Sequence, residues 1–251
     1  MNPVVRQQAR SLVTSPALQE ATAGSDLAGA FTLPHVHVGL HNAERNRRIL
    51  NVVIAMIALV LCAPLMFVIA LLVMFTSPGP ILYTQTRVGI NRRKGGSMDG
   101  RRRVNYGGRL FKIYKFRTMQ RGADSKGEVW ARPDDPRVTA VGRVLRKYRL
   151  DELPQLFNVI KGDMNLVGPR PEQPKIFTRL RTQIDHYSER QRVLPGITGL
   201  AQVCQHYDNS IEDVRRKLLF DLEYIAARSW QTDLKLLLQT VPVVIFQRGA
   251  W

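Results

Sequence analysis

Two adjacent carboxylates, Asp151 and Glu152, follow the most basic stretch of the chain. Between Arg87 and Arg149 there are 19 Lys or Arg residues and five acids, a local excess of +14 within a formal net charge of +17. Such a positive field suits phosphate-rich partners, which include nucleic acid, an anionic membrane surface and nucleotide-sugar diphosphates. A carboxylate attacks phosphorus only when nearby cations mask the charge of the phosphate. The pair is therefore a candidate for nucleophilic chemistry on a diphosphate.

The carboxylate pair also has a structural interpretation. Apolar residues recur at helical spacing over 153–160, Gly162 ends the pattern, and Pro154 lies in what would be the first helical turn. Because acidic residues commonly cap helices at such a position, Asp151 could serve only to begin the helix. Chemistry is favoured by the basic neighbours of the pair, which would neutralise a diphosphate under attack: Arg146, Lys147, Arg149 and Arg170.

Alternating and helical patterns predict the elements that would position these residues. Short strands are expected over 81–88 and 111–119, and helices over 141–148, 153–160, 211–228 and 233–246. The last helix is interrupted by Lys235, Gln239 and Pro242, which favours a core or interfacial helix over a membrane span. We therefore expect a mainly α fold with a little β, in which a membrane anchor carries a small, largely helical catalytic domain.

The membrane anchor is predicted from 27 consecutive uncharged residues, Ile49 to Phe75. As a straight helix this segment would be ~40 Å long, more than the ~30 Å hydrocarbon core of a typical bilayer. It begins too far from the N-terminus, and is too long, to be a cleavable signal peptide. Pro64 lies near its middle, where proline removes a backbone hydrogen bond and favours a kink.

Basic clusters flank this segment on both sides, and such clusters prefer the cytoplasmic face of a membrane. A helix bent at Pro64 would return both flanks to the cytoplasm as a re-entrant hairpin; an ordinary tilted span with a proline kink is the alternative. Cys62 and Cys204 form no disulfide or metal-binding pattern, which fits a reduced, cytoplasm-facing body. The expected organisation is a mobile N-terminal extension at 1–44, a re-entrant membrane helix at 45–76 and a cytoplasmic catalytic domain at 77–251.

Several motifs resemble the signature of the bacterial sugar transferases, the monotopic phosphoglycosyl transferases. The resemblance covers about residues 45 to 245. Its most specific part is the run Arg149-Leu150-Asp151-Glu152-Leu153-Pro154-Gln155-Leu156, followed by Asn158-Val159-Ile160-Lys161-Gly162-Asp163-Met164 and Val167-Gly168-Pro169-Arg170-Pro171. Further matches are Ile113 to Met119, Asp134 to Thr139, Pro195 to Leu200 and Asp221 to Tyr224. The loop from Arg92 to Gly108 departs from the family pattern, and its arginine cluster at 101–103 is a candidate contact for anionic lipid headgroups.

The resemblance implies a re-entrant membrane helix broken at Ala63-Pro64 and a catalytic dyad of Asp151 and Glu152. It implies dependence on Mg²⁺, with Asp151 as a metal ligand. Its partners would be a UDP-sugar, polyprenyl (undecaprenyl) phosphate and the lipids of the bacterial inner membrane, and no nucleic acid. Asp151 would accept a hexose-1-phosphate from the UDP-sugar, releasing UMP, and pass it to the lipid phosphate. Such a reaction would initiate the assembly of an exopolysaccharide or another surface glycan.

The resemblance also assigns roles to basic and acidic residues outside the dyad. Basic positions in the family motifs are expected to bind the phosphates and the nucleotide: Arg87, Lys115, Arg117 and Arg170. Each of them could equally be a solvated surface charge, since most basic side chains are exposed. Asp134, Asp135 and Asp221 also fall in matching motifs, at positions where a turn or a helix cap would accept an acid.

Two other functions explain part of the sequence. A non-catalytic, membrane-tethered protein that binds polyanions would account for the anchor and the charge. It leaves the acidic pair unexplained, since such a protein gains nothing from carboxylates in its basic region. An alcohol phosphotransferase of phospholipid metabolism is expected to have several spans and a spaced set of aspartates, and neither is found in the sequence.

Overall fold

The computed structural model describes residues 41–91, 106–122, 135–205 and 210–245. These residues form a mainly helical fold with two small two-stranded sheets, which confirms the predicted mainly α content with a little β. Residues 1–40 of the extension predicted at 1–44, most of the 92–108 loop, and Asp134 lie outside the described residues. The elements are α3 (His41–Thr76), β1 (Leu82–Val88), β2 (Leu110–Phe116), α4 (Ala140–Lys147), η2 (Leu150–Glu152), α5 (Gln155–Lys161), β3 (Asn165–Val167), α6 (Pro174–Gln183), η3 (Tyr187–Arg192), β4 (Gly196–Thr198), α7 (Leu200–Cys204), α8 (Ile211–Ala227) and α9 (Trp230–Ile245).

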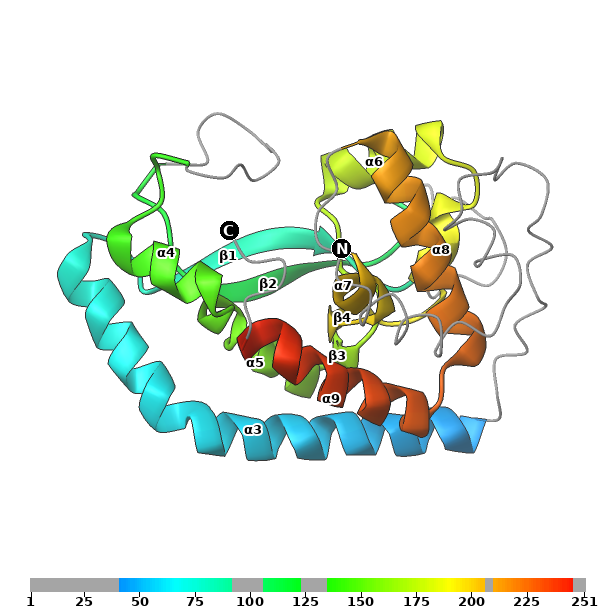
Figure 1. Cartoon of the computed structure of the whole chain (residues 1–251), viewed down its shortest axis with the longest axis horizontal. Coiled ribbons are helices and arrows are strands. Elements are labelled where there is room, and N and C mark those ends of the chain that lie inside the picture. The colour runs from blue at the N-terminus through cyan, green and yellow to red at the C-terminus, as the bar shows by residue number, and fades with distance from the viewer. Residues whose placement is uncertain (1–40, 92–105, 123–134, 206–209, 246–251) are drawn as a thin grey trace.

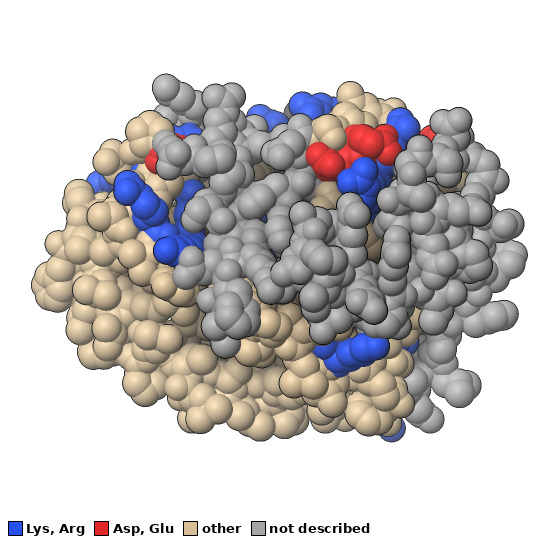
Figure 2. All heavy atoms as spheres, in the orientation of Figure 1, with Lys and Arg blue, Asp and Glu red and all other residues tan. Residues whose placement is uncertain are grey.

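Helix α3 is the apolar segment predicted to enter the membrane. It contains Pro64, and Figure 1 shows it as a bent helix that runs beneath the body and then turns upward at its far end. The helix is long and apolar enough to cross a membrane, and only 11% of its most apolar window is buried. Its surface forms the lower edge of the molecule in Figure 2, where charged side chains are almost absent.

The first part of α3 is attached to the body by polar side chains. Arg47 forms an ion pair of 2.7 Å with Asp233 at the start of α9. Asn51, a polar residue in the otherwise apolar run, accepts a hydrogen bond of 2.7 Å from the backbone N–H of Leu166. Both Arg47 and Asn51 are buried, so this part of the helix is docked on the body.

The other end of α3 is attached to the same body through Arg117, which follows strand β2. Nη2 of Arg117 donates to the carbonyl oxygens of Ser77, at 2.6 Å, and Val73, at 3.3 Å. A cation beside the last carbonyls of a helix satisfies groups that have no partner within the helix. Apolar side chains complete this contact: Val73 and Ile69 of α3 pack with Phe116 and Leu145 in a separate small core.

The two sheets place segments that are distant in sequence beside one another. β1 pairs with β2 in an antiparallel hairpin with Gln85 opposite Ile113. The short parallel pairing of β3 with β4 sets Val167 opposite Thr198. Backbones approach closely there, because a Cβ on Gly196 would lie 2.1 Å from the backbone nitrogen of Gly168.

The strands at 81–88 and 111–119 and the helices at 141–148, 153–160, 211–228 and 233–246 are confirmed to within a few residues as β1, β2, α4, α5, α8 and α9. Gly162 ends α5 in the left-handed region at φ 92°, as the helix-end pattern predicts. The sequence patterns did not predict β3, β4, α6, η3 and α7. Most of these are too short for a periodic pattern to form, so their conformation depends on packing.

Candidate active site

The carboxylate pair lies in a tight turn before α5. Arg149 adopts a left-handed conformation at φ 55°, which is uncommon for a residue other than glycine, and the 3-10 turn η2 follows over 150–152. Helix α5 begins after Pro154, and no side chain makes a capping hydrogen bond there. The interpretation of Asp151 as a simple helix cap is therefore wrong. Asp151 and Glu152 are each only 7% exposed.

Glu152 is held by two cations that the sequence analysis selected. Nζ of Lys115, from strand β2, lies 2.6 Å from Oε1 of Glu152. Nη2 of Arg170 lies 2.7 Å from the same oxygen, and Nη1 of Arg170 donates to Oε2 at 3.4 Å. Both carboxylate oxygens of Glu152 thus accept hydrogen bonds from protein side chains, so this acid orients Lys115 and Arg170.

Asp151 is paired much more weakly than its neighbour. Among the described residues, Nζ of Lys115 is the one cationic atom within ion-pair distance, at 3.9 Å from Oδ2 of Asp151. Arg146 of α4 contributes positive charge from farther away, while its Nε donates to the hydroxyl of Thr118 at 2.9 Å. Asp151 is therefore a buried carboxylate that no strong ion pair occupies.

The two adjacent acids differ in their electrostatics. Burial raises the pKa of Asp151, and the charge of Lys115 opposes this only in part. Burial would also raise the pKa of Glu152, but the charges of Arg170 and Lys115 outweigh it and hold that pKa well below its usual range. Lys115 has a lowered pKa because burial outweighs its two carboxylate neighbours. Environments that separate the pKa values of two neighbouring acids are typical of catalytic sites, where the acids take different roles.

Arg87 and Arg190 support the segment that carries Arg170. Nη2 of Arg190 donates to the carbonyl oxygen of Arg170 at 3.0 Å, and Nη1 of Arg87 donates to that of Pro171 at 3.1 Å. The backbone N–H of Val88 in β1 also donates to the carbonyl oxygen of Glu172 at 3.0 Å. These contacts fix the backbone beneath the guanidinium that reaches Glu152.

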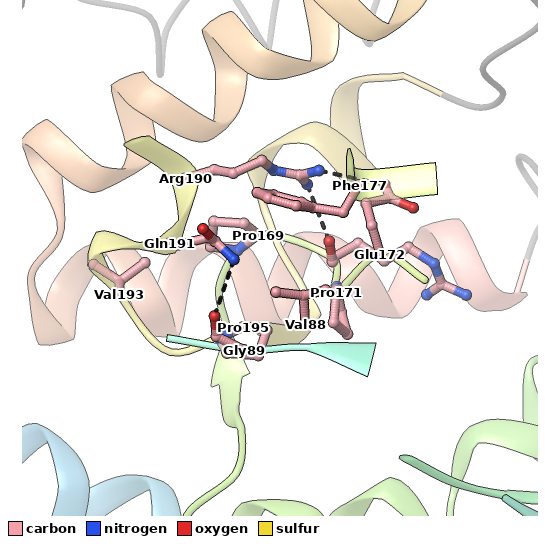
Figure 3. Close-up of a pocket in the computed structure, with 11 residues that line it drawn as sticks. Val88, Gly89, Pro169, Pro171, Glu172, Phe177, Arg190, Gln191, Val193 and Pro195 are labelled. Carbon is pink, nitrogen blue, oxygen red and sulfur yellow. Dashed lines mark hydrogen bonds and ion pairs between the residues drawn. The ribbon is translucent and has the colours of Figure 1, made fainter. Parts of the chain in front are cut away.

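A second group of charges lies beneath this segment, and we call it the interior cluster: Glu172, Arg190, Lys217 and Asp221. Arg190 lies 2.7 Å from Asp221 and 3.3 Å from Glu172, and Lys217 lies 3.1 Å from Glu172. Figure 3 shows Arg190 and Gln191 reaching toward the 169–172 segment and the end of β1. The cavity beside them has a volume of about 20 Å³, enough for a water molecule and far too small for a nucleotide.

The predicted site residues therefore divide into two groups. Lys115, Arg170, Asp151 and Glu152 meet in one place. Arg87 donates to the carbonyl oxygen of Pro171 and to the side chain of Gln85, and Arg117 donates to the carbonyl and hydroxyl oxygens of Ser77. Their assignment to substrate binding stays a prediction. The sequence analysis missed the role of Arg190, since no motif marks it and its partners are up to 31 positions away in sequence.

The remaining acids that fall in motifs take part in ion pairs away from the dyad. Asp135 lies 2.6 Å from Arg137 within its own turn, and Asp221 belongs to the interior cluster. In the described part of the chain, no group of three or more metal-ligating side chains is present. The dyad alone still fits a hard cation, because Mg²⁺ is often bound by one or two carboxylates together with substrate phosphates and water.

Comparison with known proteins identifies the family of the chain. The sequence profile described as bacterial sugar transferase matches residues 42–247. The chain is 40% identical over 204 residues to the UDP-N-acetylgalactosamine-undecaprenyl-phosphate N-acetylgalactosaminephosphotransferase of Aeromonas hydrophila, covering 81% of this chain and 44% of that protein. It is 39% identical over 221 residues to the UDP-glucose:undecaprenyl-phosphate glucose-1-phosphate transferase of Caulobacter vibrioides, covering 87% of this chain and 75% of that protein.

A third relative is the exopolysaccharide production protein ExoY of Sinorhizobium fredii, 35% identical over 221 residues, covering 82% of this chain and 88% of that protein. The chain thus spans less than half of the Aeromonas protein and most of the other two. The chain belongs to the bacterial sugar transferase family.

Proposed function

We propose that the chain transfers a hexose-1-phosphate from a UDP-sugar to polyprenyl phosphate and releases UMP. The observation that carries this proposal is the contrast within the dyad. Asp151 is buried and weakly paired, whereas Glu152 is engaged by both Lys115 and Arg170. Such an arrangement leaves one carboxylate available as a nucleophile beside two cations that can face a diphosphate. The glucose and N-acetylgalactosamine transferases among the relatives support this substrate class.

The first step forms a covalent phosphosugar on Asp151. An oxygen of the Asp151 carboxylate attacks the phosphorus that carries the sugar. The bond from this phosphorus to the oxygen bridging the two phosphates breaks, and its electron pair leaves with UMP. Arg170 and Lys115 lie where they would offset the negative charge of the diphosphate during this attack.

The second step returns the enzyme to its starting state. An oxygen of the polyprenyl phosphate attacks the same phosphorus, and the bond to Asp151 breaks with its electrons returning to the carboxylate. The product is a polyprenyl-diphosphate-sugar, the class of lipid on which exopolysaccharides and other surface glycans are assembled. The exopolysaccharide relative supports this place in glycan synthesis.

We further propose that Mg²⁺ is required and that Asp151, assisted by Glu152, would hold it. The ion would supply charge neutralisation to the diphosphate and its leaving group. Glu152 keeps Lys115 and Arg170 oriented in the same place, so the protein cations and the ion would act on one diphosphate.

We propose that α3 enters the inner membrane from the cytoplasmic side and returns to it. The support is that Arg47 and Arg117 attach the two ends of α3 to one body. The apolar arms on either side of Pro64, residues 49–63 and 65–75, are ~22 and ~17 Å long as helices, and each is shorter than the ~30 Å hydrocarbon core. A bent helix with both ends on one body fits a single face of the bilayer better than a span.

Helix α9 supports the same orientation. Its exposed apolar side chains recur at helical spacing: Trp230, Leu234, Leu238 and Val241. A helix with such a stripe is suited to lie in the membrane interface rather than to cross it. Helix α9 begins beside α3, where Asp233 pairs with Arg47, and Figure 1 shows it sloping away from α3 toward its C-terminal end.

The proposed reaction is tested with the full chain in lipid nanodiscs. We expect UMP to be released from UDP-glucose or UDP-N-acetylgalactosamine when undecaprenyl phosphate is present. Without the acceptor, we expect labelled sugar phosphate to attach to the protein in at most one equivalent. Binding of the UDP-sugar without UMP release across a panel of UDP-sugars would instead establish a non-catalytic polyanion-binding protein.

The topology is tested by cysteine labelling in a variant in which Cys62 and Cys204 are replaced by alanine. Asn46→Cys and Thr84→Cys lie on either side of the apolar run, and both should react only from the cytoplasmic side. Pro64→Leu should restore the missing backbone hydrogen bond and let some molecules expose Asn46→Cys outside. Periplasmic labelling of Asn46→Cys with Pro64 intact would establish an ordinary span.

A further inference from the structure

Strand β2 has one edge that no strand covers in the described part of the chain. The odd-numbered residues along β2 direct their backbone N–H and C=O groups toward β1. The hydrogen bonds at the two ends of the pairing show this: the N–H of Arg117 donates to the carbonyl oxygen of Ile81, and the N–H of Gly89 donates to that of Arg109. The even-numbered residues of β2 therefore direct their backbone groups to the opposite edge. An uncovered edge in the interior would leave backbone groups without partners.

The side chain of Asn158, from helix α5, occupies this edge. Its Nδ2 donates to the carbonyl oxygen of Lys112 at 2.7 Å, and its Oδ1 accepts from the backbone N–H of Tyr114 at 3.0 Å. A carboxamide presents the same donor and acceptor as a peptide group. Asn158 thus pairs with β2 as one residue of a further strand would, and it is 0% exposed.

The backbone carbonyl of Asn158 also accepts hydrogen bonds. Its carbonyl oxygen accepts from the N–H groups of Gly162, Asp163 and Met164 at 3.0 to 3.2 Å, where the chain leaves α5. Arg48 of α3 donates to the carbonyl oxygens of Ile160 and Met164, both at 3.1 Å, at the same end of the helix. Helix α5 is therefore held at its C-terminal end, and Asn158 is the residue that fixes it against β2.

This pairing has a direct consequence for the dyad. Lys115 follows Tyr114 in β2, and Glu152 lies six positions before Asn158 in the segment that leads into α5. The 2.6 Å contact between Lys115 and Glu152 therefore depends on the register between β2 and α5. A shift of ~1.5 Å, the rise of one helical residue, would break that contact.

We propose that Asn158 is a positioning residue that sets Lys115 against Glu152 and beside Asp151. The proposal rests on the proposed function, because it assigns Asn158 a part in that reaction. Asn158 touches no substrate and acts on the reaction through Lys115. An apolar side chain of the same size would fill the same space but leave Lys112 and Tyr114 without their hydrogen bonds.

The test compares Asn158→Leu with Asn51→Leu, a matched control. Asn51 is also a buried asparagine with two hydrogen bonds, of 2.8 Å to Arg47 and 2.7 Å from Leu166, but it joins α3 to β3 away from Lys115. Hydrogen exchange of the full chain in nanodiscs gives a readout that needs no activity. We expect Asn158→Leu to speed exchange of the Tyr114 amide by at least ~10-fold, and Asn51→Leu to leave it within ~3-fold.

The kinetic arm is a double-mutant cycle with Lys115→Met. Asn158→Leu should lower kcat by about 10- to 100-fold, since small misplacements of a catalytic group cost that much. In the Lys115→Met background, Asn158→Leu should lower kcat by less than a further ~3-fold, because Lys115 is already absent. Asn51→Leu should lower kcat by the same factor in the Lys115→Met background as in the wild type. If Asn158→Leu does not fold, Asn158→Asp keeps the shape and the acceptor, loses the donor, and enters the same cycle.

The outcomes separate this inference from the proposed function. Multiplying effects of the Asn158 and Lys115 substitutions, or unchanged exchange at Tyr114, would overturn the positioning role even if the wild type releases UMP. A wild type that releases no UMP from any UDP-sugar would refute the proposed function. The exchange of Tyr114 would then still decide whether Asn158 holds the edge of β2.

Discussion

Two clusters of the same composition perform different tasks in this protein. In the active cluster, Glu152 binds Lys115 and Arg170 and Asp151 lies beside them; in the interior cluster, Glu172 binds Lys217 and Arg190 and Asp221 lies beside them. Each cluster has two acids and two bases. The clusters differ in how their second acid is paired and in how far their cations reach solvent.

The charged side chains of the interior cluster are largely buried and form ion pairs with one another. Asp221 lies 2.7 Å from Arg190, whose side chain is 4% exposed. In the active cluster, Asp151 lies 3.9 Å from its nearest paired cation, and the side chain of Arg170 is 33% exposed. Identical residue types thus form a tightly paired cluster in one place and leave a weakly paired carboxylate and a partly exposed guanidinium in the other.

The largest expected effect separates the two aspartates. Asp151→Asn should lower turnover by at least ~10⁴-fold, because an amide keeps the size of the side chain but cannot attack phosphorus. Thermal unfolding should stay near the wild-type temperature, and the covalent phosphosugar should be absent. Asp221→Asn should do the reverse, lowering the unfolding temperature while keeping the covalent intermediate. Turnover near the wild-type value in Asp151→Asn would refute Asp151 as the nucleophile.

The next effect separates the two arginines. Arg170→Ala should lower kcat/KM by about 10²- to 10³-fold, since it removes a charge-assisted contact to the diphosphate. Arg190→Met should lower the free energy of unfolding by about 3–5 kcal/mol, because it leaves the buried carboxylate of Asp221 without its paired cation and Glu172 with Lys217 alone. Urea unfolding and steady-state kinetics on both variants measure these effects. If Arg170→Ala and Arg190→Met lowered kcat/KM equally and stability equally, the proposed difference between the two clusters would be wrong.

The contribution of Glu172 to stability depends on pH. The Glu172 carboxyl is buried, yet the charges of Lys217 and Arg190 lower its pKa to about 2 from the ordinary 4.5. Its folded-state pKa is below its unfolded-state value, so its contribution is present above the unfolded pKa, at about 3 kcal/mol, and is lost as the pH falls from about 4.5 toward 2. Glu172→Gln should remove this pH dependence in acid-unfolding curves measured over that window. An unchanged curve would mean that Glu172 is paired equally in the unfolded chain.

The smallest effect concerns the charge around Asp151. Arg146 favours the ionised form of Asp151, so Arg146→Gln should raise the pKa of that carboxyl further. The acid limb of the pH profile for kcat/KM should then move to higher pH, because a smaller fraction of Asp151 is ionised at a given pH. Arg143→Gln, an exposed change on the same helix, should leave the limb in place. Movement of the limb to lower pH would contradict this assignment.

Local patterns in the sequence were enough to predict the longer elements and to indicate the chemistry. The apolar run around Pro64, the alternation in β2, and the helix that Gly162 ends all express short-range rules of backbone geometry, and each appears in the structure. The neighbouring acids with their basic surround, together with the motif matches, indicated the reaction class before any distance was known. These signals are contained within a few consecutive residues, so they can be read without the fold.

The tertiary structure decided which charges meet. Lys115 and Arg170 stand 37 and 18 positions from Glu152 and reach it, whereas Arg87 and Arg117 donate to carbonyl and side-chain oxygens elsewhere. An ion pair needs its atoms within about 4 Å, and that distance follows from the packing of α3, β2, α5 and the 168–172 segment rather than from spacing along the chain. For the same reason no sequence pattern marked Arg190 or the pairing of Asn158 with β2, since each depends on an edge or a cavity that exists only after the chain has folded.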